Sequence, residues 1–219
     1  MSIAKNLIEI KSQLLENVTL VAVSKTKPVS ELMEAYEAGQ RVFGENKIQE
    51  MTSKFEEMPK DIQWHMIGHI QSNKVKYMAP FVSLIHAVDS LKLLKEINKQ
   101  ALKNNRVISC LLQVKIADEE SKFGLSEDDV LQLLVSEEFN SLQNIKIEGL
   151  MGMATFTNDE AQLIQEFQKL NTLYATLKNK YNLSTLSMGM SGDYPIAISN
   201  GSNMVRVGSA IFGKRNYSI

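Results

Sequence analysis

The chain alternates between two kinds of segment along its length. Short runs rich in β-branched residues, typical of buried strands, are each followed by a longer stretch with the hydrophobic period of an amphipathic helix. This alternation, with no block of consecutive strands, predicts a parallel sheet, because parallel strands need a crossover between them. The expected strands cover residues 18–24, 40–45, 62–68, 82–88, 107–114, 145–151, 185–188 and 203–207.

The number of strand–helix pairs suggests how the sheet closes. Eight pairs in 219 residues match a (β/α)8 TIM barrel of minimal size. We therefore predict an α/β fold with a single (β/α)8 TIM barrel and an extra N-terminal helix over residues 3–15. A doubly wound open sheet is the alternative that the same alternation allows. Because no linker, low-complexity stretch or sequence repeat interrupts the pattern, residues 1–219 are expected to form one domain.

The composition narrows the class of partner and the compartment. The chain has 24 Lys and Arg against 25 Asp and Glu, spread along the sequence, which argues against a nucleic-acid ligand and favours a small molecule. No apolar stretch approaches the roughly 18 residues of a membrane span. Cys110 is the one cysteine, so an intrachain disulfide is excluded, and the N-terminal segment carries charges unlike those of a secretory signal. We expect a cytoplasmic protein that does not bind membranes.

In a barrel of this kind, functional groups lie at the carboxyl ends of the strands. Lys25 continues the alternation of Val21 and Val23, so its amine is expected at the barrel mouth. Partial burial there would lower the pKa of the amine, and the neutral form could attack a carbonyl to give a Schiff base. The alternative is a lysine that ends in solvent. Lys27 precedes Pro28, which holds it extended, and we expect it to point outward.

Arg206 lies inside the expected strand 203–207. Both faces of such a strand are excluded from solvent, since one faces the barrel interior and the other faces the helices. A guanidinium group stays charged there and must have hydrogen-bond partners. Arg206 therefore either closes an internal ion pair or receives a ligand, and the sequence leaves both open.

Glycine-rich segments follow the last two expected strands. Small residues let the backbone approach an anion closely, and Ser191 and Ser209 add hydroxyl donors. Barrel enzymes frequently bind phosphate after strands seven and eight, so we predict a phosphate site here. Two ordinary left-handed turns are the alternative. Methionines are expected to line the barrel mouth nearby, namely Met151, Met153, Met188 and Met190.

The remaining reactive side chains are given structural roles. His65 and His69 are four residues apart but lie in a strand-like segment without the glutamate of a metalloprotease helix, so no metal site is predicted. His86 is expected to be a hydrogen-bonded histidine near the sheet, and Cys110 a buried thiol.

A lysine that can form an imine, a buried arginine and a phosphate cradle together suggest pyridoxal 5′-phosphate, or PLP, as the ligand. Ordered motifs along essentially the whole chain are similar to those of one family. They are AVSKTKP at 22–28, FGEN at 43–46, WHMIGHIQSNK at 64–74, HAVDS at 86–90, GLM at 149–151, LSMGMS at 186–191 and VRVGSAIFG at 205–213. On these motifs the chain resembles the pyridoxal phosphate homeostasis protein family.

The resemblance implies a barrel similar to the N-terminal domain of alanine racemase, with Lys25 as the Schiff-base lysine. It further implies phosphate contacts from Ser191, Gly208 and Ser209, and Arg206 near the pyridine nitrogen. An arginine there should leave that nitrogen unprotonated and the cofactor a poor electron sink. Asn46 and Met190 complete the predicted cofactor site.

The function that the resemblance implies is to buffer PLP and deliver it, without robust catalysis, as a monomer with PLP-dependent apoenzymes as partners. A PLP-dependent racemase or lyase is the alternative, and a phosphate-binding barrel without pyridoxal is a third. A racemase needs a second acid–base group. Because the chain ends shortly after Phe212, we expect no additional domain to supply one, and an open cofactor face.

Three positions depart from the family pattern. Ser209 replaces a more frequent threonine and keeps the hydroxyl group. Lys47 and Lys115 stand where an aromatic residue and an asparagine are usual. Either lysine could place a competing amine near the barrel mouth.

Overall fold

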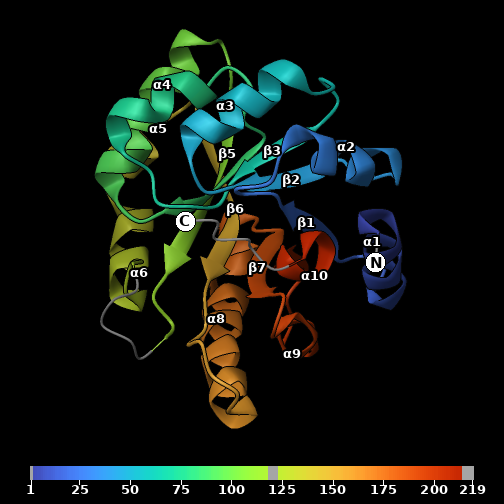
Figure 1. The fold of residues 1–219 in the computed structure, drawn as a ribbon. Coiled ribbons are helices and arrows are strands. Elements are labelled where there is room, and N and C mark those ends of the chain that lie inside the picture. Colours follow the sequence, from blue (N-terminus) through green and yellow to red (C-terminus); the bar gives the residue numbers. More distant parts are fainter. Residues whose placement is uncertain (1, 118–122, 214–219) are drawn as a thin grey trace.

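The computed structural model describes residues 2–117 and 123–213, and these form a closed barrel of parallel strands (Figure 1). Each strand pairs with the next along the chain, and the last pairs with the first, with Thr19 opposite Met204. This confirms the (β/α)8 barrel, and the open-sheet alternative is wrong. The strands are β1 (Thr19–Val23), β2 (Val42–Glu45), β3 (Gln63–Met66), β4 (Leu84–Val88), β5 (Ile108–Val114), β6 (Ile145–Gly152), β7 (Thr185–Met190) and β8 (Met204–Val207).

Helices surround the barrel, and their starts follow local capping chemistry (Figure 1). Ser90, Ser126 and Asp159 each accept a backbone N–H bond at a helix start, which satisfies groups that have no intrahelical partner. The helices are α1 (Ile3–Gln13), α2 (Val29–Glu37), α3 (Ile48–Glu57), a 3₁₀ turn (Ser72–Lys74), α4 (Val75–Met78), α5 (Leu91–Lys103), α6 (Glu127–Val135), α7 (Glu137–Asn140), α8 (Glu160–Tyr181), α9 (Tyr194–Ser199) and α10 (Ser209–Phe212). The extra N-terminal helix is therefore confirmed as α1, which contacts α2 and α10.

The core has two parts because strand side chains alternate between two faces. The larger part lies between the strands and the helices and includes Leu20, Ala22 and Trp64. The smaller part lies inside the barrel around Val21, Leu84, Ala87, Leu111, Met151 and Met204. Val21 on the inner face places Val23 and Lys25 on the same side, toward the barrel mouth.

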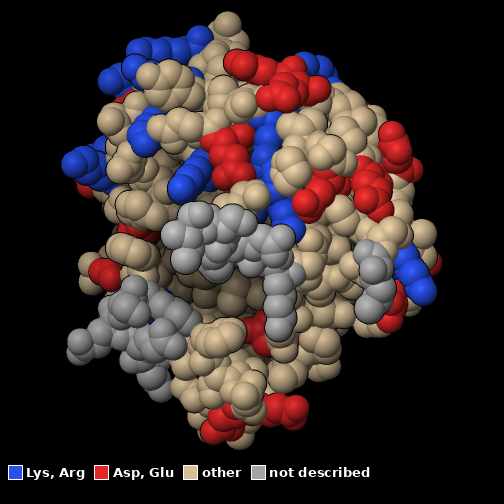
Figure 2. All heavy atoms as spheres, in the orientation of Figure 1, with Lys and Arg blue, Asp and Glu red and all other residues tan. Residues whose placement is uncertain are grey.

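The surface carries charges of both signs. On the face shown in Figure 2, acidic and basic side chains are interspersed, in keeping with a formal net charge of -1. Among the described helices, none has the length and apolar character needed to cross a membrane.

Candidate functional site

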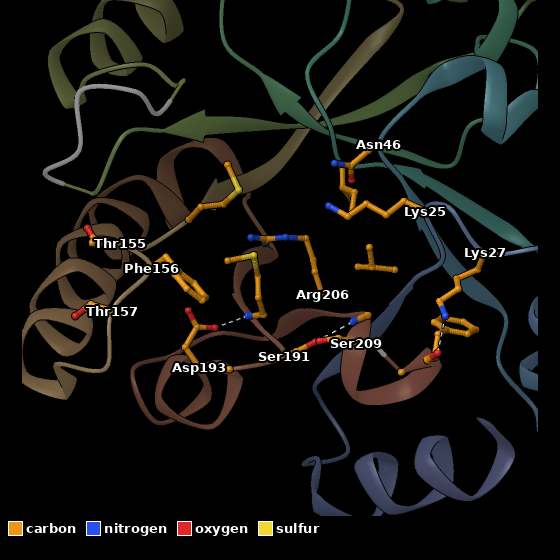
Figure 3. A pocket seen from close by; sticks show the side chains of 18 of the residues that line it. Lys25, Lys27, Asn46, Thr155, Phe156, Thr157, Ser191, Asp193, Arg206 and Ser209 are labelled. Atoms are coloured by element: carbon orange, nitrogen blue, oxygen red, sulfur yellow. Dashed lines mark hydrogen bonds between the residues drawn. The ribbon is translucent and has the colours of Figure 1, made fainter. Parts of the chain in front are cut away.

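A cavity of about 560 Å³ opens at the carboxyl ends of the strands (Figure 3). Its lining comes mainly from the first two strand ends and the last three, which are far apart in sequence but adjacent around the barrel. All seven residues predicted to bind a cofactor line this cavity, namely Lys25, Asn46, Met190, Ser191, Arg206, Gly208 and Ser209. The barrel therefore brings the complete predicted set to one place.

Lys25 is half-buried and its side chain reaches into the cavity beside Asn46 (Figure 3). The strand ladder continues through Ser24, whose N–H donates to Gly44 O at 3.1 Å. The next residue, Thr26, has φ +63°, in the left-handed region that a β-branched residue rarely adopts. The chain thus turns sharply immediately after Lys25, and the lysine occupies the tip of β1.

Lys27 does not point outward, so that prediction is wrong. It lines the cavity, donates from Nζ to Phe212 O at 2.7 Å and pairs with Glu31 Oε2 at 3.2 Å. The residue before a proline is restricted in its backbone, but this does not set the direction of its side chain. Lys27 is a second amine at the cavity wall. Neither Lys47 nor Lys115 is among the described residues that line it.

Arg206 is 4% exposed and presents its guanidinium group to the cavity from the inner face of β8. Its Nη1 donates to Ser187 Oγ at 2.7 Å and its Nη2 donates to Gly152 O at 3.0 Å. Burial lowers the pKa of Arg206 to about 10, partly opposed by the negative charge of Asp193. The group remains protonated at neutral pH and can donate further hydrogen bonds into the cavity.

Two buried histidines continue the hydrogen-bonded chain that starts at Arg206. Ser187 Oγ lies 3.1 Å from His86 Nδ1, and His86 Nε2 lies 3.0 Å from His65 Nδ1. Burial lowers the pKa of His65 to about 3 and the pKa of His86 well below its ordinary value, so both are neutral at pH 7. The chain links β3, β4, β7 and β8 through the barrel interior and orients Arg206.

The histidine roles differ in part from the sequence interpretation. His86 is hydrogen-bonded and buried, as predicted, and Cys110 is a buried thiol, as predicted. His69 lies apart from His65, with Nδ1 3.6 Å from Asp89 Oδ2. The pairing of His65 with His86 was missed, although the alternation of β3 and β4 could have indicated that both face inward.

The opposite end of the cavity is formed by backbone and hydroxyl groups of the segments after β7 and β8. Gly208 N–H donates to Ser191 Oγ at 3.1 Å, which leaves the Ser191 hydroxyl proton able to donate elsewhere. A Cβ on Gly208 would lie 3.1 Å from Val23 O, so a glycine fits this close approach to β1. The first helical bonds of α10 come from Ile211 and Phe212, and the amides of Ser209 and Ala210 precede them.

The remaining wall is the segment after β6, which the sequence interpretation did not assign to the site beyond Met153. Thr155, Phe156, Thr157 and Asn158 all line the cavity. Thr155 donates from N and from Oγ1 to the Glu166 carboxylate at 2.6 and 2.7 Å, which fixes this loop to α8. No local motif marks these residues, because the contact with α8 positions them.

The methionine prediction is correct in part. Met153 and Met190 line the cavity. Met151 packs in the inner core below it, and Met188 packs outward against the helices. The prediction is wrong for Met151, which lies deeper inside the barrel, and for Met188, which lies on the outer face of β7.

The fold and the site together define a class of protein: a closed (β/α)8 barrel with an amine, a guanidinium group and hydroxyl donors around one cavity at its strand ends. Comparison of the sequence and the fold with known proteins also indicates a barrel of this kind. Residues 1–216 match the model of the alanine racemase N-terminal domain. An alanine racemase from Clostridium difficile 630 has a TM-score of 0.78 at 16% identity, covering 99% of this chain and 58% of that chain, which shows a shared fold.

More similar relatives identify the family. The pyridoxal phosphate homeostasis protein of Vibrio alginolyticus is 44% identical over 209 residues, covering 93% of this chain and 89% of its own length. That of Escherichia coli K12 is 40% identical over 210 residues, covering 93% and 88%. The chain belongs to the family of pyridoxal phosphate homeostasis proteins.

Solved structures of one relative, PipY, have the same fold as this chain. PipY of Synechococcus elongatus PCC7942 without PLP has a TM-score of 0.90 at 37% identity, covering 97% of this chain and 100% of PipY. PipY with PLP bound has a TM-score of 0.87 at 35% identity, with the same coverage.

Proposed function

We propose that this protein binds PLP in the cavity as a Schiff base with Lys25 and holds it in reserve for other proteins. One observation carries the proposal: an amine from the tip of β1 and hydroxyl and amide donors after β7 and β8 line the same cavity, together with a buried guanidinium group. PLP carries an aldehyde, a phosphate and a pyridine nitrogen, so each end of the cavity has a matching group. That a relative at 35% identity has been solved with PLP bound supports the assignment.

The residues present fit the chemistry of each contact. Lys25 would supply the amine: in its unprotonated form an amine condenses with the aldehyde carbon, a C=N bond forms, and the carbonyl oxygen leaves as water. Ser191 and Ser209 hydroxyls and the Gly208 segment bind the phosphate. Asn46 and Met190 contact the ring from the cavity wall.

Arg206 explains why binding would not lead to robust catalysis. A protonated guanidinium donates a hydrogen bond to the pyridine nitrogen and cannot accept one. The nitrogen then stays unprotonated, and the ring withdraws electrons poorly from a bound amino group. We therefore propose a noncatalytic carrier that acts as a monomer in the cytoplasm and passes PLP to apoenzymes.

A PLP titration tests the assignment. The protein should gain a visible absorption band that saturates at one equivalent. Lys25→Ala should lose this band, whereas Lys47→Ala, an exposed lysine outside the cavity lining, should keep it. A wild-type protein that gains no band on titration would instead be a phosphate-binding barrel without pyridoxal.

A second pair of assays separates a carrier from an enzyme. A carrier loaded with PLP should activate a PLP-dependent apoenzyme when the two are mixed. A racemase or lyase should instead exchange the α-proton of an amino acid for deuterium. Exchange at turnover rates with any amino acid of a standard panel would contradict the carrier proposal.

A further inference from the structure

A buried ammonium group lies behind the turn that carries Lys25. Lys54, on α3, is 5% exposed, and its Nζ donates to Ser24 O at 2.8 Å, Glu45 Oε1 at 2.7 Å and Glu50 Oε1 at 2.7 Å. An ammonium group has three N–H donors, so these contacts use all of them. The network joins the end of β1, the end of β2 and α3.

The two carboxylates of this network hold the residues on both sides of Lys25. Ser24 Oγ donates to Glu45 Oε1 at 2.6 Å, and Thr26 N–H donates to Glu50 Oε1 at 2.6 Å. Together with the bond from Lys54 to Ser24 O, three hydrogen bonds hold the residues immediately before and after the lysine, two of them at backbone atoms and one at the Ser24 hydroxyl group. Lys25 itself remains directed into the cavity.

The conformation held in this way is not one that the chain adopts spontaneously. Thr26 is in the left-handed region with φ +63°, which costs about 1–2 kcal/mol for a residue with a Cβ. Such a conformation persists where surrounding contacts determine it. The bond from Thr26 N–H to Glu50 is one of those contacts, and Lys54 keeps the Glu50 carboxylate in place.

Stability alone does not account for the network. A buried ion pair often stabilises a fold no more than a well-packed apolar residue of the same volume. Burial also raises the pKa of Glu45, an effect that the charge of Lys54 opposes. Lys54 therefore counteracts part of the cost of burying this carboxylate, and the contacts of the network converge on residues 24 and 26 within hydrogen-bond distance.

We propose that Lys54 is a positioning residue for Lys25: through Glu45 and Glu50 it fixes the turn that aims the Lys25 amine at the carbonyl group of the ligand. The inference deepens the proposed function and rests on it. Lys54 itself does not line the cavity among the described residues, so it acts through the backbone of residues 24–26.

The test compares two ligands that differ only at the reacting carbon. PLP can condense with an amine, whereas pyridoxine 5′-phosphate carries an alcohol there and cannot. In Lys54→Met, we expect the rate and equilibrium constant of Schiff-base formation with PLP to fall by at least about 10-fold, since misplacing a reacting group by about 1 Å can cost 100-fold. Binding of pyridoxine 5′-phosphate should change by less than about 2-fold. Lys95→Met is the matched control, because Lys95 pairs with Glu138 on the exposed surface.

Glu50→Ala gives a second, milder perturbation. Glu50 is partly exposed, and this change removes the acceptor of the Thr26 N–H while leaving the pair of Lys54 and Glu45 intact. It should also weaken Schiff-base formation selectively, and it decides the question if Lys54→Met does not fold.

Equal losses for both ligands would show a structural role and overturn the inference, as would unchanged binding of PLP in both variants. If the wild-type protein forms no Schiff base at all, the proposed function fails and the inference with it. If wild type forms the Schiff base on Lys25 and the variants do so equally well, the inference alone fails.

Discussion

The buried histidine pair makes the stability of the barrel sensitive to mild acid. His65 and His86 are both buried, and burial lowers the pKa of His65 to about 3 and that of His86 well below 6.5. In the unfolded chain both return to the ordinary value. The unfolded state therefore binds more protons below pH 6.5, and stability is lost as the pH falls from there toward the folded-state values.

The size of the effect follows from proton linkage. Lowering the pH from 7 to 5 stabilises the unfolded state by about 2 kcal/mol for each histidine that stays neutral in the folded protein, or about 4 kcal/mol for the pair. This is a large part of the 5–15 kcal/mol by which domains are usually stable. The folded barrel should keep its structure at pH 5 but unfold at a lower urea concentration.

Urea unfolding at pH 7 and pH 5 measures this loss. His69→Gln is the control, because His69 is half-exposed and lies outside the pair, so this variant should keep the pH dependence that His65 and His86 produce. Proton NMR of the folded protein gives a direct check on the three histidines. A stability change below about 1 kcal/mol, or ring resonances of His65 and His86 that titrate near pH 6.5, would refute the reasoning.

Two further predictions concern the phosphate end and the barrel wall. Ser191→Ala removes the acceptor of the Gly208 N–H and one hydroxyl donor to an anion. Hydrogen bonds to charged groups contribute about 1.5–3 kcal/mol. The affinity for PLP should therefore fall by roughly 10- to 100-fold. Pyridoxal, which lacks the phosphate, should bind this variant as well as wild type, and parallel losses for both aldehydes would contradict the phosphate assignment. Gly149→Ala would place a Cβ against the carbonyl of Thr185, 2.6 Å from its carbon, and should destabilise the barrel by at least about 3 kcal/mol in urea unfolding. A Cβ at Gly192 would have no atom within 4 Å, so Gly192→Ala should change the free energy of unfolding by less than about 0.5 kcal/mol. Equal destabilisation by Gly149→Ala and Gly192→Ala would contradict the close packing of β6 against β7 at Gly149.

The fold could be predicted from sequence because its signal is local and repeated. Each strand and helix has its own hydrophobic period, and eight repeats leave little choice of topology. The same alternation placed Lys25 at the barrel mouth, and it lines the cavity there. For Arg206 the sequence required a buried, hydrogen-bonded guanidinium group but left its face of the strand open, and the structure places it toward the cavity. Glycine and serine after the last two strands indicated the other end of the cavity.

What the sequence did not reveal depends on contacts between distant residues. The direction of Lys27 is set by the turn at Thr26 and by Phe212, which lies 185 residues away. The wall at Thr155 depends on Glu166 of α8. In the sequence, Lys54 is one of several charged residues of an expected helix, and nothing local distinguishes it. Its contact with Ser24 depends on the fold, which brings α3 next to the end of β1.

The central claim concerns a single nitrogen atom, and chemical trapping tests it most directly. Purified protein is mixed with one equivalent of PLP, reduced with borohydride, digested and mapped by mass spectrometry. We predict that the reduced phosphopyridoxyl group is attached to Lys25. Its attachment mainly to Lys27, the other amine on the cavity wall, or to any lysine outside the cavity would contradict the account.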